Sequence, residues 1–145
     1  MSVLTDIASA VAAELNAAPP GTFEPTFTAQ RAYLPVFDLK DMADLHVTVV
    51  PKGVVIQSAS RAVSQYDYSV DIGVQKKLAV TAPSEIDPLM ALVERIADFF
   101  RQRRLSACPS AAWVKTEHTH LYAQEHMNEL RQFTSVLTLT FRVMR

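Results

Sequence analysis

The stretch Gln65-Tyr66-Asp67-Tyr68-Ser69-Val70-Asp71-Ile72-Gly73-Val74-Gln75 has the clearest periodicity in the chain. Apolar or aromatic residues alternate with polar residues or glycine along its whole length. Successive side chains of a strand point to opposite faces of a sheet, so this alternation predicts a half-buried strand. A second alternating stretch closes the chain, with Phe133, Leu137 and Phe141 on one face and mostly threonines on the other. These two strands are expected to form the centre of a sheet.

Shorter extended segments are predicted around these two strands. They lie near residues 27–34, 45–50, 54–57 and 113–117 and are rich in β-branched or aromatic residues. Pro51-Lys52-Gly53 predicts a turn between two of them, and the polar stretch Ser58–Ser64 predicts a loop or an exposed hairpin end. Residues 38–44, 106–110 and 118–131 are interpreted as connections. Because most connections are short, the strands are expected to pair antiparallel.

Two helices are predicted from apolar residues that recur every three or four positions. The first begins after Ser2, a good N-cap, and ends at the run Ala17-Ala18-Pro19-Pro20-Gly21. The second is expected to begin with Asp87 as N-cap and Pro88 at the first helical position. Its apolar face comprises Ile86, Leu89, Met90, Val93, Ile96, Ala97 and Phe100.

The order helix, strands, helix, strands predicts one α+β domain that spans residues 1–145. We expect two main helices packed on an antiparallel sheet of about four to six strands, in two layers. The chain has 145 residues, of which 49% are hydrophobic and 20% charged, a balance that is typical of one globular core.

Composition argues against several classes of protein. Cys108 is the only cysteine, so no disulfide can form within the chain and a zinc site of several thiolates is excluded. The apolar stretches are too short to span a bilayer, and the N-terminal stretch lacks the basic region of a secretory signal. The net charge of −1 predicts no overall attraction to nucleic acid. Charge is uneven, with an acidic excess in residues 1–50 and a basic excess in residues 51–145.

A search for catalytic or binding residues favours none. The three glycines are too far apart for a nucleotide-binding loop. His118 and His120 have the spacing of two ligands on one strand face, and His126 or Glu125 could complete a metal site, but ordinary polar histidines are the favoured interpretation. Cys108 is interpreted as an incidental thiol. Five carboxylates could form acid–base pairs, but their positions favour the solvated face of a strand or helix over a catalytic role. They are Asp67, Asp71, Asp87, Glu94 and Asp98.

No enzyme activity, cofactor or metal is therefore predicted, and the remaining candidates are contacts with other proteins. Long strands at a sheet edge tend to pair with neighbouring chains. A basic cluster, Arg101, Arg103 and Arg104, follows the second helix. Its positive charges also interact favourably with the negative end of the helix dipole. Partner contacts are predicted at Ser58, Ser60, Arg61, Ser64, Arg101, Arg103 and Arg104.

Several stretches resemble small neck proteins of long-tailed bacteriophages. They are Asp87-Pro88-Leu89-Met90 with residues 93–100, Trp113-Val114-Lys115-Thr116-Glu117, residues 126–141 (HMNELRQFTSVLTLTF), and Leu45–Gly53 with the following Ser-rich residues and Gln65-Tyr66-Asp67-Tyr68. The resemblance lies in the general pattern of residue types and in the order of the predicted elements. It covers most of residues 27–143. Within that group the chain is most similar to the tail terminator family.

That resemblance implies a sheet flanked by helices and a hexameric ring of identical subunits. Such a ring caps the finished tail tube, stops its polymerisation and provides the surface for joining to the head. The implied partners are other copies of the chain, the tail tube protein and a head-completion or connector protein. Neither a membrane nor a sequence-specific nucleic acid is among them, although DNA passes through such a ring. The implied location is the neck of the virion, after assembly in the host cytoplasm.

Three alternatives remain beside the terminator. The chain also fits a head-completion or head–tail joining neck protein of similar length. From different classes, a small ligand-binding or hydrolytic domain and a small nucleic-acid-binding domain stay open. A ring subunit is expected to associate with itself or with the tail tube, whereas an enzyme is expected to have a pocket with perturbed titratable groups.

Overall fold

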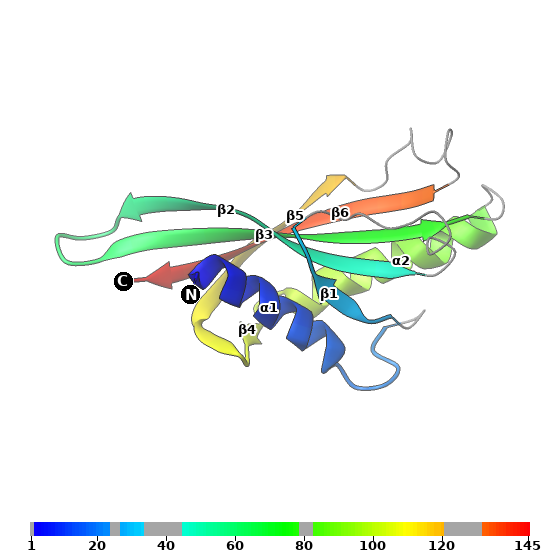
Figure 1. Cartoon of the computed structure of the whole chain (residues 1–145), viewed down its shortest axis with the longest axis horizontal. Coiled ribbons are helices and arrows are strands. Elements are labelled where there is room, and N and C mark those ends of the chain that lie inside the picture. Colours follow the sequence, from blue (N-terminus) through cyan, green and yellow to red (C-terminus); the bar gives the residue numbers. More distant parts are fainter. Residues whose placement is uncertain (1, 24–26, 34–44, 79–82, 121–131) are drawn as a thin grey trace.

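The computed structural model describes residues 2–23, 27–33, 45–78, 83–120 and 132–145. Within these residues the chain forms two helices and six strands in the order α1, β1, β2, β3, α2, β4, β5, β6. The strands form one sheet with the spatial order β1-β2-β3-β6-β5-β4 (Figure 1). The predicted α+β class with two main helices is confirmed.

Helix α1 (Val3–Asn16) begins and ends where the sequence predicts. Ser2 caps it, and its Oγ accepts a hydrogen bond from the backbone N–H of Thr5 at 3.4 Å. Ile7, Val11 and Leu15 are buried along one face. The helix ends one residue before Ala17, at the start of the proline-rich run.

The sheet is mixed, so the prediction of an antiparallel sheet was wrong for one pair of strands. β1 (Ala29–Arg31) pairs parallel with Val47–Val49 of β2 (His46–Ser58). Residues 32–45 separate the two strands, which is roughly the dozen residues that a parallel crossover requires. β1 is also shorter than the predicted strand near residues 27–34. The connection predicted at residues 38–44 lies outside the described residues.

The predicted turn at Pro51-Lys52-Gly53 is instead a bulge inside one continuous strand. β2 pairs antiparallel with β3 (Ser64–Lys77) from His46 to Ser58, and the register shifts between Pro51 and Gly53. The pairing of β1 with β2 stops at Val49, so Pro51 lies on an edge strand, where proline is tolerated. A bulge adds one residue without reversing the chain.

β3 and β6 (Gln132–Met144) are the two central strands and confirm the alternation predicted for them. They pair antiparallel from Gln65 with Met144 to Lys77 with Gln132. On one face, Val70 lies opposite Leu139 and Ile72 opposite Leu137, and all four side chains are fully buried. This face, called here the helix face, packs with α1 and α2 into one hydrophobic core.

Helix α2 (Pro83–Phe100) begins earlier than predicted. Pro83 occupies the start of the helix, and Pro88 lies inside it. Pro88 cannot donate the backbone hydrogen bond of an interior position, which costs stability. Burial of the apolar face offsets that cost, because five side chains are buried: Leu89, Leu92, Val93, Ile96 and Phe100.

The predicted loop at residues 106–110 is mostly strand. β4 (Arg104–Leu105) and β5 (Cys108–His120) form a tight hairpin in which Leu105 pairs with Cys108. Leu105 and Ala111 are fully buried, so the core holds this hairpin in place. The short strand predicted at residues 113–117 is therefore the middle of a longer one. Residues 121–131, part of the predicted irregular stretch, lie outside the described residues.

The β2–β3 hairpin extends past α1, and Figure 1 shows it reaching beyond the end of β6. We call this extension the arm and define it as Gly53–Ser58 of β2, Ser64–Ser69 of β3 and 140–144 of β6, which pair with one another. The remaining sheet with its two helices is called the body. Neither described helix is long and apolar enough to cross a membrane.

Candidate functional site

The histidine arrangement that could bind a metal is not assembled among the described residues. His118 is exposed on β5, and a register shift separates it from His120. Within the described ranges, no three His, Cys, Asp or Glu side chains come together. His126 and Glu125 lie outside those ranges. The interpretation of these histidines as ordinary polar residues stays a prediction.

Cys108 is the first residue of β5 and is half-buried opposite Leu105. It lies in the tight β4–β5 hairpin rather than in the predicted loop. Pro109 and Ser110 beside it are exposed. Its interpretation as an incidental thiol stays a prediction.

The two aspartates of β3 are paired with neighbouring strands rather than with each other. Asp67 accepts two hydrogen bonds from the Arg142 guanidinium of β6, at 2.9 and 3.2 Å. The hydrogen bond from Arg142 holds the pKa of Asp67 below its ordinary value, against the opposing effect of burial. Asp71 accepts a hydrogen bond from the Thr138 hydroxyl at 2.6 Å. Both carboxylates therefore link strands on the face opposite the helices. The remaining acidic candidates, Asp87, Glu94 and Asp98, are exposed on α2.

All three arginines of the basic cluster are exposed, but they differ in their contacts within the chain. Arg103 binds Glu14 of α1 at 3.2 Å, donates to the carbonyl oxygen of Phe99 at 2.8 Å and covers the Phe99 ring. Glu14 also accepts a 2.6 Å hydrogen bond from the backbone N–H of Ser106. Burial opposes ionisation of Glu14, but these hydrogen bonds outweigh it, so its pKa lies below the ordinary value. Arg103 thus ties α1 to the end of α2 although its side chain is 40% exposed. Arg101 and Arg104 are exposed as well.

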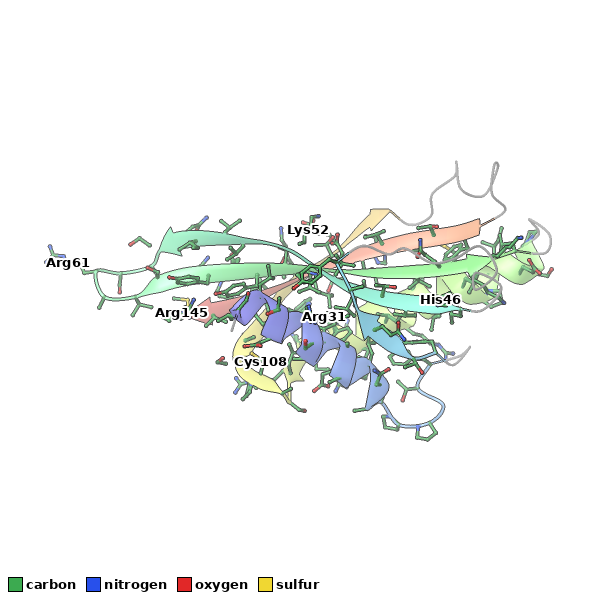
Figure 2. All side chains as sticks on the ribbon, in the orientation of Figure 1. Arg31, His46, Lys52, Arg61, Cys108 and Arg145 are labelled. Carbon is green, nitrogen blue, oxygen red and sulfur yellow. The ribbon has the colours of Figure 1, made fainter. Side chains whose placement is uncertain are left out.

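The other predicted contact residues lie together at the tip of the arm. Ser58, Ser60, Arg61 and Ser64 surround the turn that joins β2 to β3, and Figure 2 shows Arg61 pointing away from the body. The backbone N–H groups of Ala59 and Ser60 both donate to the carbonyl oxygen of Val63, which closes the turn. The tip is therefore an ordered and exposed end of the sheet.

The arm carries an apolar edge that the sequence did not reveal. Val54, Val55 and Ile56 are 44%, 55% and 57% exposed, although β-branched side chains favour half-buried strands. No described strand pairs with the outer edge of β2 beyond Val49, apart from a hydrogen bond from Ala32 to that residue. Gly53–Ser58 contains no charge and no proline, the two devices that commonly protect an edge strand.

The helix face of the arm, on which Val54 and Ile56 lie, carries an aromatic cluster that stiffens it, whereas Val55 pairs with Asp67 on the opposite face. The rings of Tyr66 and Tyr68 stack at 6.1 Å, and the Arg145 guanidinium lies 4.4 Å from the Tyr66 ring centre. Arg145 also donates to the Tyr68 hydroxyl at 3.2 Å and pairs through its backbone with Ser64. Val54 and Ile56 lie beside this cluster, because they pair with Tyr68 and Tyr66. The apolar edge is thus presented on a well-ordered support.

A second edge without a described neighbour lies on the opposite side of the sheet, on β5. Among the described residues, β4 covers only the start of β5, at Cys108 and Ala112. Beyond it, a groove of about 360 Å³ separates β5 from the end of α2. Its lining includes Ala97 of α2, Arg101 just after that helix, and Trp113, Val114 and Thr116 of β5. The indole N–H of Trp113 donates to the Thr116 hydroxyl at 2.9 Å, which fixes the ring in the groove wall.

No known protein family model matches the chain, and no functionally characterised protein matches it in sequence.

Proposed function

We propose that this chain is a phage tail terminator subunit, which forms a ring on the end of the tail tube. The ring stops polymerisation of the tube and provides the surface to which the head joins. The subunit is then a structural component of the virion neck and acts through contacts with proteins rather than through catalysis.

One observation supports this proposal most strongly, namely the apolar, uncharged outer edge of the arm. An exposed edge of this kind is a hazard to a monomer, because it offers unpaired backbone groups and apolar side chains to any other strand. In an assembly the same edge is covered by a neighbour. Val54, Val55 and Ile56 are therefore best explained as residues of a subunit contact.

The position of the two unpaired edges also favours a ring over a symmetric dimer. The arm edge belongs to β2 and the groove edge to β5, on opposite sides of the sheet. A contact between two different surfaces is heterologous; repeated from copy to copy it forms a ring where the rotation closes and an open filament where it does not. The tip residues Ser58, Ser60, Arg61 and Ser64 then remain for contact with the tail tube protein or the connector.

Electron microscopy of particles made without this protein tests the proposed role. Tails that lack their terminator should be overlong and uncapped, because nothing stops addition of tube subunits. Free tails of normal length beside full heads would instead identify a head–tail joining protein. Normal particles would contradict both neck functions.

Deletion of Ala59–Val63 tests the role of the arm tip more narrowly. The deletion removes the turn but leaves the apolar edge and the core unchanged. We expect the purified chain to keep its circular dichroism spectrum and complementation with it to yield few joined particles. A normal particle yield would exclude the tip from partner contact.

A further inference from the structure

Each subunit carries two complementary surfaces on opposite sides of one sheet. The first is the arm edge, Gly53–Ser58 of β2, where apolar side chains are exposed. The second is the groove between β5 and the end of α2, where strand residues 113–118 lack a described neighbour on one side. We propose that the arm edge of one copy adds to β5 of the next copy as an extra strand and fills its groove. This inference rests on the proposed ring and names the contact that builds it.

Strand directions permit this addition without breaking the sheet pattern. β2, β3, β6 and β5 are successive antiparallel neighbours, so β2 and β5 of one chain run in opposite directions. A neighbouring copy that continues the sheet keeps the same strand directions. Its β2 therefore meets β5 antiparallel, the pairing already used by the other long strands of the sheet.

The side chains of the arm edge point to the side on which the groove opens. Val54 and Ile56 pair with Tyr68 and Tyr66, which alternate in register with the core residues of β3 and so lie on the helix face. The groove is bounded by α2 and therefore opens on that face. An added β2 strand places Val54 and Ile56 beside Ala97 and Trp113, where both side chains leave water.

Electrostatics do not oppose the contact. The arm edge from Gly53 to Ala59 is uncharged, so its entry brings no like charge to the groove. The groove carries groups of both signs, namely Asp98 of α2, Arg101 just after that helix and Lys115 of β5. Lys115 is held by Glu117 at 2.8 Å on the same strand. A neutral apolar strand is thus a better occupant than a charged segment of either sign.

Pairing of β2 with a second β2 is the rival arrangement. It would form a closed symmetric dimer and leave the groove of each copy empty. Strand addition to β5 covers both the arm edge and the groove. In an open chain of subunits, one arm edge stays uncovered at one end and one groove at the other. The two arrangements differ in one measurable respect, which is whether groove residues contribute to association.

The test uses two variants of the full chain, Ile56→Asp on the arm and Val114→Asp in the groove. Ile56 is 57% exposed and Val114 is the half-buried extra residue at a bulge of β5, so neither change places a charge in the buried core. Each variant alone should lose self-association, with the dissociation constant raised about 10- to 100-fold. Ser9→Asp, which adds the same charge on an exposed position of α1, should leave association unchanged.

Mixing the two variants gives the decisive result. Ile56→Asp retains an intact groove and Val114→Asp retains an intact arm, so one proper contact can form between them. We expect native mass spectrometry to show mixed dimers and no larger species. Ala97→Arg, which fills the groove from α2, should behave like Val114→Asp and shows that the effect does not depend on one site.

Three outcomes would overturn the inference. The first is full association of Val114→Asp and Ala97→Arg, which would favour β2–β2 pairing. The second is a mixture that stays monomeric. The third is a wild-type chain that is monomeric at about 1 mM, where even a contact of 1 mM dissociation constant would be half occupied. In each case overlong tails in particles without this protein would still support the terminator function. Failure of this inference can therefore be distinguished from failure of the proposed function.

Discussion

The arm and the body are built from the same strands but differ in the interactions that stabilise them. In the body, Ile72 and Leu139 are fully buried beneath the helices. A few residues along the same sheet, Val54 and Ile56 have similar side chains and are about half exposed. The body is held by burial of apolar surface, whereas the β2 edge of the arm is held by backbone pairing with β3 beside the Tyr66–Tyr68 stack and Arg145. Buried apolar residues, including Phe141 and Val143 of the arm, therefore contribute to folding, whereas the exposed Val54 and Ile56 are available for assembly.

The largest difference is expected between core and arm truncations. Leu139→Ala should lower the free energy of unfolding by about 2–5 kcal/mol, because it leaves a cavity in the core. Ile56→Ala should change it by less than about 0.5 kcal/mol in the monomer. Urea unfolding followed by circular dichroism measures both at a concentration where the chain is monomeric. Equal losses would mean that the arm is part of the folding core.

An intermediate effect is expected at Glu14, which links the two helices of the body. Glu14→Gln should lower stability by about 1–2 kcal/mol near neutral pH, because it removes the charge that Arg103 and the Ser106 N–H stabilise. The pKa of Glu14 is lowered in the folded chain, so its contribution is present above the unfolded value of about 4.3. That contribution is lost as the pH falls through the lower folded pKa.

The measurement is a series of thermal unfolding curves for the wild type and Glu14→Gln between neutral and acidic pH. The two curves should converge as the medium becomes acidic. Arg101→Gln is a matched control, since Arg101 is exposed nearby and is expected to leave stability unchanged. A difference that persists unchanged in acid would show that the carboxylate charge is not the source of the effect.

A smaller effect than that of Glu14→Gln is expected at Asp67, within the arm. Asp67→Asn removes the ion pair with Arg142, whose side chain is 37% exposed, and pairs of this kind contribute about 1 kcal/mol or less. High salt should reduce the difference from the wild type, because solvent ions screen the pair. The denaturation midpoint in low and high salt measures this. A loss of stability that is the same in low and high salt would show that the Asp67 carboxylate acts through the geometry of its hydrogen bonds and not through its charge.

Periodicity in the sequence predicted the elements that make most of the core. The alternation in residues 65–75 and 133–143 and the helical spacing from Leu4 to Leu15 correspond to β3, β6 and α1. The parallel pair of β1 and β2 was not predictable, because three residues carry little periodicity and pairing depends on distant residues. The start of α2 was misplaced because Pro83 and Pro88 are both plausible first residues of a helix.

The candidate site was predicted only in part. The polar composition of Ser58–Ser64 located the hairpin tip, but Gly53 within Pro51-Lys52-Gly53 suggested a turn where the chain makes a bulge. Val54, Val55 and Ile56 were then interpreted as an ordinary strand, since apolar residues in sequence do not show whether a helix covers them. Val54 and Ile56 lie on the helix face in the part of the hairpin that extends past α1, whereas Val55 pairs with Asp67 on the opposite face. Likewise, Arg103 was grouped with Arg101 and Arg104, although only Arg103 reaches Glu14.

Hydrogen exchange along β2 tests most directly whether the arm edge is the contact between copies. Residues 53–58 in the monomeric Ile56→Asp variant should exchange quickly, because their outward amides have no strand to bind. In the assembled wild-type chain the account predicts marked protection of this segment and of residues 113–118, with the core of β3 unchanged. Equal exchange of residues 53–58 in the assembled wild type and in the monomeric variant would contradict the account.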